Sequence, residues 1–371
     1  MNHPLAERDV RADALRGLML VIIAIDHIPN PLREFTYQSV GFVSAAEGFV
    51  FLSGYVAGLV YTRQALSGTL TALWKRAASR AGQIYLYHIV VFTAILLATT
   101  LKVLQATQLE SWAPLFYKNA PLALLLGATL TYQPRFQDIL PMYCVLILLA
   151  PVLVALLVRR RILLVLSASL ALWFCAQFGI RAAIARAVFH TLPIDLGDFD
   201  VFAWQLLFVG GFCVGFRRCN GTKQEPRFET VSLAVCYALA LALFALRQDL
   251  LFPNSSAFLW PLAEKTPLGP VRVLNFLMLA FLISREAFWP KQAFWVRSLA
   301  YLGRHSLQVF SFNILCVHLV LGVFSDWDSR PALTKLIIAI LCAASLCVPA
   351  SMHEFWLRLR RRDCPESRAT S

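Results

Sequence analysis

Two side chains in the first apolar stretch have the types and the spacing of a reacting pair. Arg16 and His27 are eleven residues apart. On a helix with about 100° and 1.5 Å per residue, they lie about 20° apart on one face and about 16 Å apart along the axis. A guanidinium binds phosphates, and an imidazole takes up a proton near neutral pH. The pair therefore predicts an anionic donor at one end of this helix and proton abstraction at the other.

Two acidic residues are candidates for orienting His27. Asp26 precedes it but points about 100° away on the same helix, and Glu47 in the second apolar stretch is expected at a similar depth. A carboxylate beside an imidazole selects its tautomer and stabilises the imidazolium. Both candidates stay open, with Glu47 favoured. The alternative interpretation is that Arg16 reaches lipid phosphate and that His27 only forms a hydrogen bond to a neighbouring helix. Asp13, three residues before Arg16, weakens this alternative because its carboxylate can hold the guanidinium in place.

The elements that must position these residues are membrane-spanning helices. Of the 371 residues, 58% are hydrophobic and 15% are charged, and the mean hydropathy is +0.64, which leaves too little polar surface for a soluble domain. We predict an all-α polytopic membrane protein, a single domain over 1–371 with a short basic tail over 358–371. About ten stretches have the length that crosses a bilayer: 11–30, 40–62, 81–104, 139–158, 162–180, 201–216, 230–247, 271–288, 305–324 and 333–356.

The charges report topology rather than a nucleic-acid partner. The formal charge is +13, and its Lys and Arg residues gather beside alternate ends of the predicted spans, which the positive-inside rule makes cytoplasmic. Both termini are therefore expected inside. The apolar stretch 122–130 is too short to span and is expected to be re-entrant or interfacial. The nine cysteines are scattered singly without metal-ligand spacing, so no metal is expected. The basic loops are 63–80, 159–161, 217–229, 285–304 and 358–362.

Further polar residues divide between the two predicted sides. Arg76 and Arg80 precede the third span, and clustered arginines suit phosphates, although positive-inside signalling explains them equally. On the outer side, a second set is a candidate groove for an acceptor. Interhelical hydrogen bonds or the interfacial aromatic belt are the alternative for each member. The set consists of His88, Asp138, Tyr143, Trp204 and Gln205.

Several motifs resemble known membrane acyltransferases. An Arg and a His separated by ten residues, followed by F-L-S-G-Y at 51–55, resemble the acyltransferase-3 superfamily. The wider set is similar to the OpgC family from the first span to the ninth. A late-span His of the superfamily is replaced by Asn313, with His318 close by. The motifs are R-x-D-x-L-R-G at 11–17, D-H at 26–27, E-G-F-V-F-L-S-G-Y at 47–55, D-I-L-P-M-Y at 138–143, A-W-Q-L-L-F at 203–208 and L-G-R-H-S-L-Q-V-F at 302–310.

The resemblance implies an enzyme of the bacterial inner membrane. It would take an acyl group, for this family a succinyl group, from cytoplasmic acyl-CoA and pass it to a hydroxyl of a periplasmic glucan, with acyl-CoA as a substrate and no permanently bound cofactor. Arg16 and His27 match the functional Arg and His of the superfamily, and Arg76 and Arg80 would add to a site for the CoA phosphates. His27 would act as a base or carry the acyl group itself. The alternatives are another envelope sugar as acceptor, or a proton-coupled transporter, for which no inverted repeat is found.

Overall fold

The computed structural model describes residues 9–104, 107–189, 195–221, 229–285, 290, 292–324 and 326–362. These residues are helical or irregular, with no strand among them. Residues 363–371 of the predicted basic tail and most of the predicted loop 217–229 lie outside the described residues.

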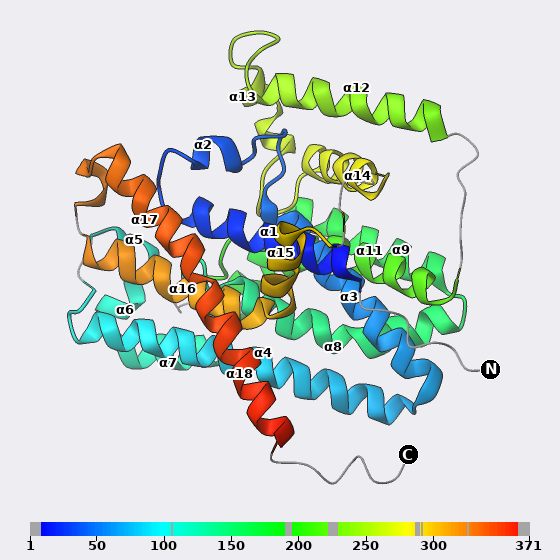
Figure 1. Ribbon diagram of the computed structural model, residues 1–371, viewed down its shortest axis with the longest axis horizontal. Coiled ribbons are helices and arrows are strands. Elements are labelled where there is room, and N and C mark those ends of the chain that lie inside the picture. The colour runs from blue at the N-terminus through cyan, green and yellow to red at the C-terminus, as the bar shows by residue number, and fades with distance from the viewer. Residues whose placement is uncertain are drawn as a thin grey trace.

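The helices follow one another in the order shown in Figure 1. They are α1 (Val10–His27), α2 (Arg33–Thr36), α3 (Ala45–Ser67), α4 (Leu70–Thr100), α5 (Thr107–Trp112), α6 (Pro114–Lys118), α7 (Ala120–Ala128), α8 (Ile139–Val158), α9 (Ile162–Gln177), α10 (Ile180–Val188), α11 (Val201–Cys219), α12 (Glu229–Arg247), α13 (Ser255–Leu259), the 3-10 helix η1 (Trp260–Leu262), α14 (Pro270–Arg285), α15 (Phe294–Arg304), α16 (Ser306–Val323), the 3-10 helix η2 (Trp327–Ser329), α17 (Ala332–Ser345) and α18 (Cys347–Arg362).

The prediction of a helical membrane protein agrees with this fold, but the count of ten spans is not confirmed. Within the described residues, five segments are long and apolar enough to cross a bilayer, and α9 with α10 makes a sixth if that pair, bent by 72°, is one span. The five are α3, α4, α8, α16 and the pair α17 with α18. Each of the other predicted stretches still falls on a helix. Their helices are short or carry charge, as α1 does.

Several predicted boundaries are wrong, each for a local reason. The third predicted span begins at Leu70 instead of residue 81, because Thr69 caps the helix by accepting from the N–H of Ala72, so most of the predicted loop 63–80 is helical. At 31 residues, α4 is about 46 Å long and exceeds a bilayer core of about 30 Å. The second span begins at Ala45, after a capping box between Ser44 and Glu47.

Small residues bring the central helices into close contact. Helices α3 and α11 each carry two glycines one helical turn apart, at Gly54 and Gly58 and at Gly211 and Gly215. A Cβ at Gly54 would lie 2.0 Å from the carbonyl oxygen of Phe208, so only glycine allows this crossing. This is the small-residue packing of membrane helices, where association depends on close van der Waals contact.

The remaining helices surround this centre. In Figure 1, α1 lies in the middle of the molecule, α17 and α18 cross its front, and α12 lies along one edge beside α14. The side chains of α17 and α18 are mostly exposed and apolar, such as Leu341 and Phe355, as expected of a surface that faces lipid. The stretch 122–130 forms the short helix α7, which packs on α4 and α6.

Candidate active site

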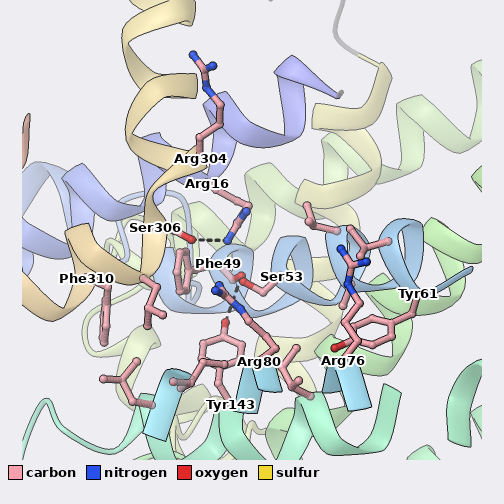
Figure 2. A pocket seen from close by; sticks show the side chains of 17 residues that line it. Arg16, Phe49, Ser53, Tyr61, Arg76, Arg80, Tyr143, Arg304, Ser306 and Phe310 are labelled. Carbon is pink, nitrogen blue, oxygen red and sulfur yellow. Dashed lines mark hydrogen bonds between the residues drawn. The ribbon is translucent and has the colours of Figure 1, made fainter. Parts of the chain in front are cut away.

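The larger of two cavities is lined by arginines from three helices. This arginine cavity has a volume of about 370 Å³ and is lined by Arg16 of α1, Arg76 and Arg80 of α4, and Arg304 of α15. Figure 2 shows Arg16 and Arg80 above the Tyr143 ring and Arg76 beside Tyr61, with the Arg304 guanidinium turned away at the rim. Arg16 has a side-chain exposure of 11%, whereas the other three arginines are exposed. The cavity therefore has one half-buried arginine inside and three exposed arginines at its rim.

Arg16 is held from three directions. Its guanidinium donates to the Ser306 hydroxyl, lies 3.9 Å from the Asp13 carboxylate, and stands 6.0 Å from the centroid of the Phe49 ring. The predicted contact with Asp13 is therefore present. A guanidinium fixed in this way can bind an anion without further loss of side-chain freedom.

The crossing of α1 and α15 explains why Arg304 and Ser306 come so close to Arg16. A Cβ at Gly17 would lie 1.9 Å from the Leu299 carbonyl oxygen, and one at Gly303 equally close to that of Asp13. The two backbones are therefore in direct contact. The segment that follows Gly303 is carried against the first helix, which delivers both side chains to the cavity.

The smaller cavity contains His27. This histidine cavity has a volume of about 150 Å³ and is lined by His27 and Asp26 of α1 and by Asp138, which precedes α8. Three cations from separate loops and short helices also line it: Arg33, Arg135 and Lys265. A base, carboxylates and cations therefore surround one small space.

Phe310 of α16 lines both cavities. Its ring stacks on Phe49 with the centroids 6.0 Å apart and the planes at 19°, and Phe49 also lines the arginine cavity. Arg16 and His27 lie on the same face of α1, as their spacing predicts, each in a different cavity. The Phe310 side chain is thus part of the partition between a basic space and a space with a base.

The partner of His27 is an amide. Nδ1 of His27 lies 3.3 Å from Nδ2 of Asn313, and the imidazole packs against the Phe136 ring with centroids 4.3 Å apart. Oδ1 of Asn313 is buried without a hydrogen-bond partner. A half-turn of the amide places Oδ1 against Nδ1, where it accepts the Nδ1 proton and leaves Nε2 free to act as a base. His318, the other residue considered at this position, packs against the Phe136 ring with the centroids 6.2 Å apart, and its Nδ1 lies 2.8 Å from the Ile314 carbonyl oxygen.

The two acids of the histidine cavity have their own hydrogen bonds. Asp26 accepts from the Thr36 hydroxyl, and Asp138 accepts from the backbone N–H of Asp198 at 2.7 Å. Burial, with a smaller effect of Asp198, raises the pKa of Asp138 to about 6. The segment 195–200 reaches Asp138 only because Gly197, at φ +69°, has no Cβ to collide with it.

Glu47 lies in a buried ion pair. Its Oε1 accepts from Arg272 of α14 at 2.6 Å, and both side chains have zero exposure. Its Oε2 accepts from the N–H and the hydroxyl of Ser44, at 2.9 Å and 2.7 Å. The structure thus places Glu47 where it joins α3 to α14 and closes a capping box, with Ser44 itself on the wall of the histidine cavity. A role of Glu47 beside His27 stays a prediction from the sequence.

The other candidate residues lie partly outside the cavities. Tyr143 lines the arginine cavity, where its hydroxyl donates to the Phe49 carbonyl at 3.4 Å. Gln205 bonds Ser169 at 2.7 Å and so joins α11 to α9. His88 bonds the Gly127 carbonyl at 3.2 Å. The Trp204 indole donates to the carbonyls of residues 265 and 266, each at 3.2 Å. The last three therefore hold segments of the fold together and line neither of the two cavities.

Four residues that line the two cavities do not follow from the sequence reasoning. They are Arg33, Arg135, Lys265 and Arg304. Asn313 is noted in the sequence only as a departure from the late-span His, and its contact with His27 comes from the structure. Arg304 belongs to the motif at 302–310, and the other cations are basic residues in segments that the charge rule assigns to the outer side. Basic residues on the side where the positive-inside rule expects few are the feature of the sequence that points to this site. Among the described residues, no three His, Cys, Asp or Glu side chains gather as metal ligands would.

The fold and the two cavities define a helical membrane protein with a basic cavity and a histidine cavity that share Phe310 in their walls. Residues 8–358 match the family described as OpgC protein. The chain therefore belongs to the OpgC family, and the match covers both cavities. No curated protein and no solved structure matched the chain.

Proposed function

We propose that this protein is a membrane acyltransferase that moves a succinyl group from acyl-CoA to a hydroxyl of a periplasmic glucan. The observation that carries the proposal is the pair of cavities on either side of Phe310, one lined by four arginines and the other by His27. Membership of the OpgC family supports an acyltransferase role in glucan modification. The motifs also favour a place in the wider acyltransferase-3 superfamily.

The arginine cavity is the proposed donor site. Phosphates of CoA would bind the exposed guanidinia of Arg76, Arg80 and Arg304 at the rim of the cavity. Arg16 would bind the part of the CoA molecule that reaches furthest into the cavity. The long arm of CoA would then pass Phe310 and bring the thioester to His27, about 16 Å further along α1. This cavity would face the cytoplasm of a bacterium, in the inner membrane, because basic segments surround it.

The histidine cavity is the proposed site of transfer. Nε2 of His27 takes the proton of the glucan hydroxyl while the hydroxyl oxygen attacks the thioester carbonyl carbon. The carbon–sulfur bond breaks, and the CoA sulfur takes the proton from the imidazolium and leaves as a thiol. Asn313 acts as a positioning residue: its amide lies against Nδ1 of His27, and with the amide turned so that Oδ1 faces Nδ1 it would select the Nδ1–H tautomer.

The test is the glucan composition of cells that lack the protein and carry wild type, His27→Ala or Arg16→Ala. Wild type should restore succinylated, acidic glucan, and both variants should fail at normal expression. The matched control is Arg186→Ala, which changes an exposed arginine of α10 outside both cavities and should complement fully. Unchanged glucans in every strain would contradict succinyl transfer. Activity retained by His27→Ala would remove the base from the mechanism.

A further inference from the structure

Three cations of the histidine cavity have no part in the mechanism above. Their contacts are with aromatic rings. Arg33 lies 4.9 Å from the Tyr37 centroid, Arg135 5.1 Å from that of Trp112, and Lys265 4.7 Å from that of Phe199. In the part of the chain that the structure describes, none of the three has an Asp or Glu oxygen within 4.0 Å. A cation over a ring keeps other N–H groups for an acceptor.

The acids of the same cavity do not neutralise these cations directly. Asp26 is bonded to Thr36, and Asp138 to a backbone N–H. Asp198, the third acid, lies close enough to Asp138 to disfavour its charge. Asp26 and Asp138 act on the cations only through space, since no carboxylate oxygen of the described residues lies within 4.0 Å of Arg33, Arg135 or Lys265. The three cations therefore keep N–H donors for an acceptor in the space beside His27.

The cations are near the reacting atoms. Lys265, Arg135 and Arg33 line the same cavity of about 150 Å³ as His27. An acyl group at His27 would have its far end among them. An uncharged acyl chain would fill this space without giving the cations a partner, whereas a carboxylate at the end of a short chain would accept from all three.

We propose that Lys265, Arg135 and Arg33 form a binding site for the distal carboxylate of the acyl group. The site makes the enzyme select a dicarboxylic acyl group over an uncharged one of the same length. This inference rests on the proposed acyl transfer and adds the residues that determine donor specificity.

The fold holds two of these residues in advance. The Trp204 indole donates to the backbone carbonyl of Lys265 at 3.2 Å, and the N–H of Arg135 donates to the Trp112 carbonyl at 3.4 Å. Each side chain also packs on an aromatic ring of a neighbouring segment. Groups held before the ligand arrives lose little freedom on binding, which increases the affinity that their charge provides.

The test compares two donors on the full-length protein purified in lipid nanodiscs. The donors are succinyl-CoA and butyryl-CoA, which share a four-carbon chain and differ in the terminal carboxylate, and the acceptor is an unmodified neutral glucan. For Lys265→Met and Arg135→Leu, kcat/KM with succinyl-CoA should fall about 10- to 100-fold, the loss expected for a charged hydrogen bond, while kcat/KM with butyryl-CoA stays unchanged. The matched control Arg330→Leu removes a surface cation paired with Asp326 and should change neither value.

Each other outcome has one meaning. An equal fall with both donors, or a raised KM for the glucan alone, would overturn the carboxylate site, because the cations would then serve the fold or the acceptor. A wild-type enzyme that uses both donors equally would also overturn it while leaving acyl transfer intact. If the wild type transfers neither group, the proposed function itself fails. Two variants in separate segments are used so that misfolding of one does not decide the result.

Discussion

Asn313 is the residue on which the chemistry of His27 depends most directly. Its amide lies 3.3 Å from Nδ1, so Asn313→Leu should leave the imidazole without a tautomer partner and lower kcat/KM by about 10²-fold, the lower limit for a positioned base. Asn313→His supplies a ring nitrogen at the same place and should retain more activity, with a second titrating group in the pH profile of kcat/KM. Equal activity and one unchanged pH profile for both variants would show that Asn313 does not position His27.

The sequence predicts part of the site at this scale. The spacing of Arg16 and His27 places them on one face because helix geometry is regular, and Arg76 with Arg80 follows from the same rule. Asn313 and Lys265 depend on contacts between segments far apart in the chain, which no local pattern contains. Glu47 has the residue type of a catalytic acid, but Arg272, 225 residues away, is the partner that the fold gives it.

Among the elements, α3 depends on the ion pair that joins its first turn to α14. Glu47→Leu or Arg272→Met alone leaves an unpaired buried charge and should destabilise the protein by about 3–5 kcal/mol, whereas the double variant should recover most of that loss. Thermal unfolding in detergent ranks the stability of the wild type, the two single variants and the double variant. The exposed pair of Asp326 and Arg330 is the control, since Asp326→Asn should leave the unfolding temperature nearly unchanged. A double variant no more stable than either single one would contradict the coupling.

Helix positions follow from hydropathy, but helix ends do not. Every predicted span falls on a helix because burial or lipid requires a long apolar segment with satisfied backbone groups. The ends are decided by caps such as Thr69 and by breaks such as the one at Leu346, between α17 and α18. Those features depend on single side chains and turns. A hydropathy average over about twenty residues does not detect them.

For the whole molecule, the number of spans is the feature that hydropathy predicts least well. Helix α1 carries Arg11, Asp13, Arg16 and Asp26 within 18 residues, yet it lies in the middle of the molecule (Figure 1). A helix surrounded by other helices meets protein and cavities rather than lipid, so its charges carry no cost of exposure to hydrocarbon. Charge in a central helix therefore indicates a site and does not by itself exclude a span.

The two cavities must open to opposite sides of the membrane if the donor is to pass Phe310 and meet the acceptor at His27. Ser79, an exposed residue between Arg76 and Arg80, reports on the first side, and Ser329 in η2 reports on the second. The Trp327 indole of η2 donates to the Pro29 carbonyl at 2.9 Å, so this helix adjoins the end of α1 at His27. In a background without native cysteines, an impermeant maleimide should label Ser329→Cys in intact cells and Ser79→Cys only after lysis. Labelling of both residues from outside would place the arginine cavity beyond the reach of cytoplasmic acyl-CoA and contradict the proposed path, even if His27 and Arg16 are essential.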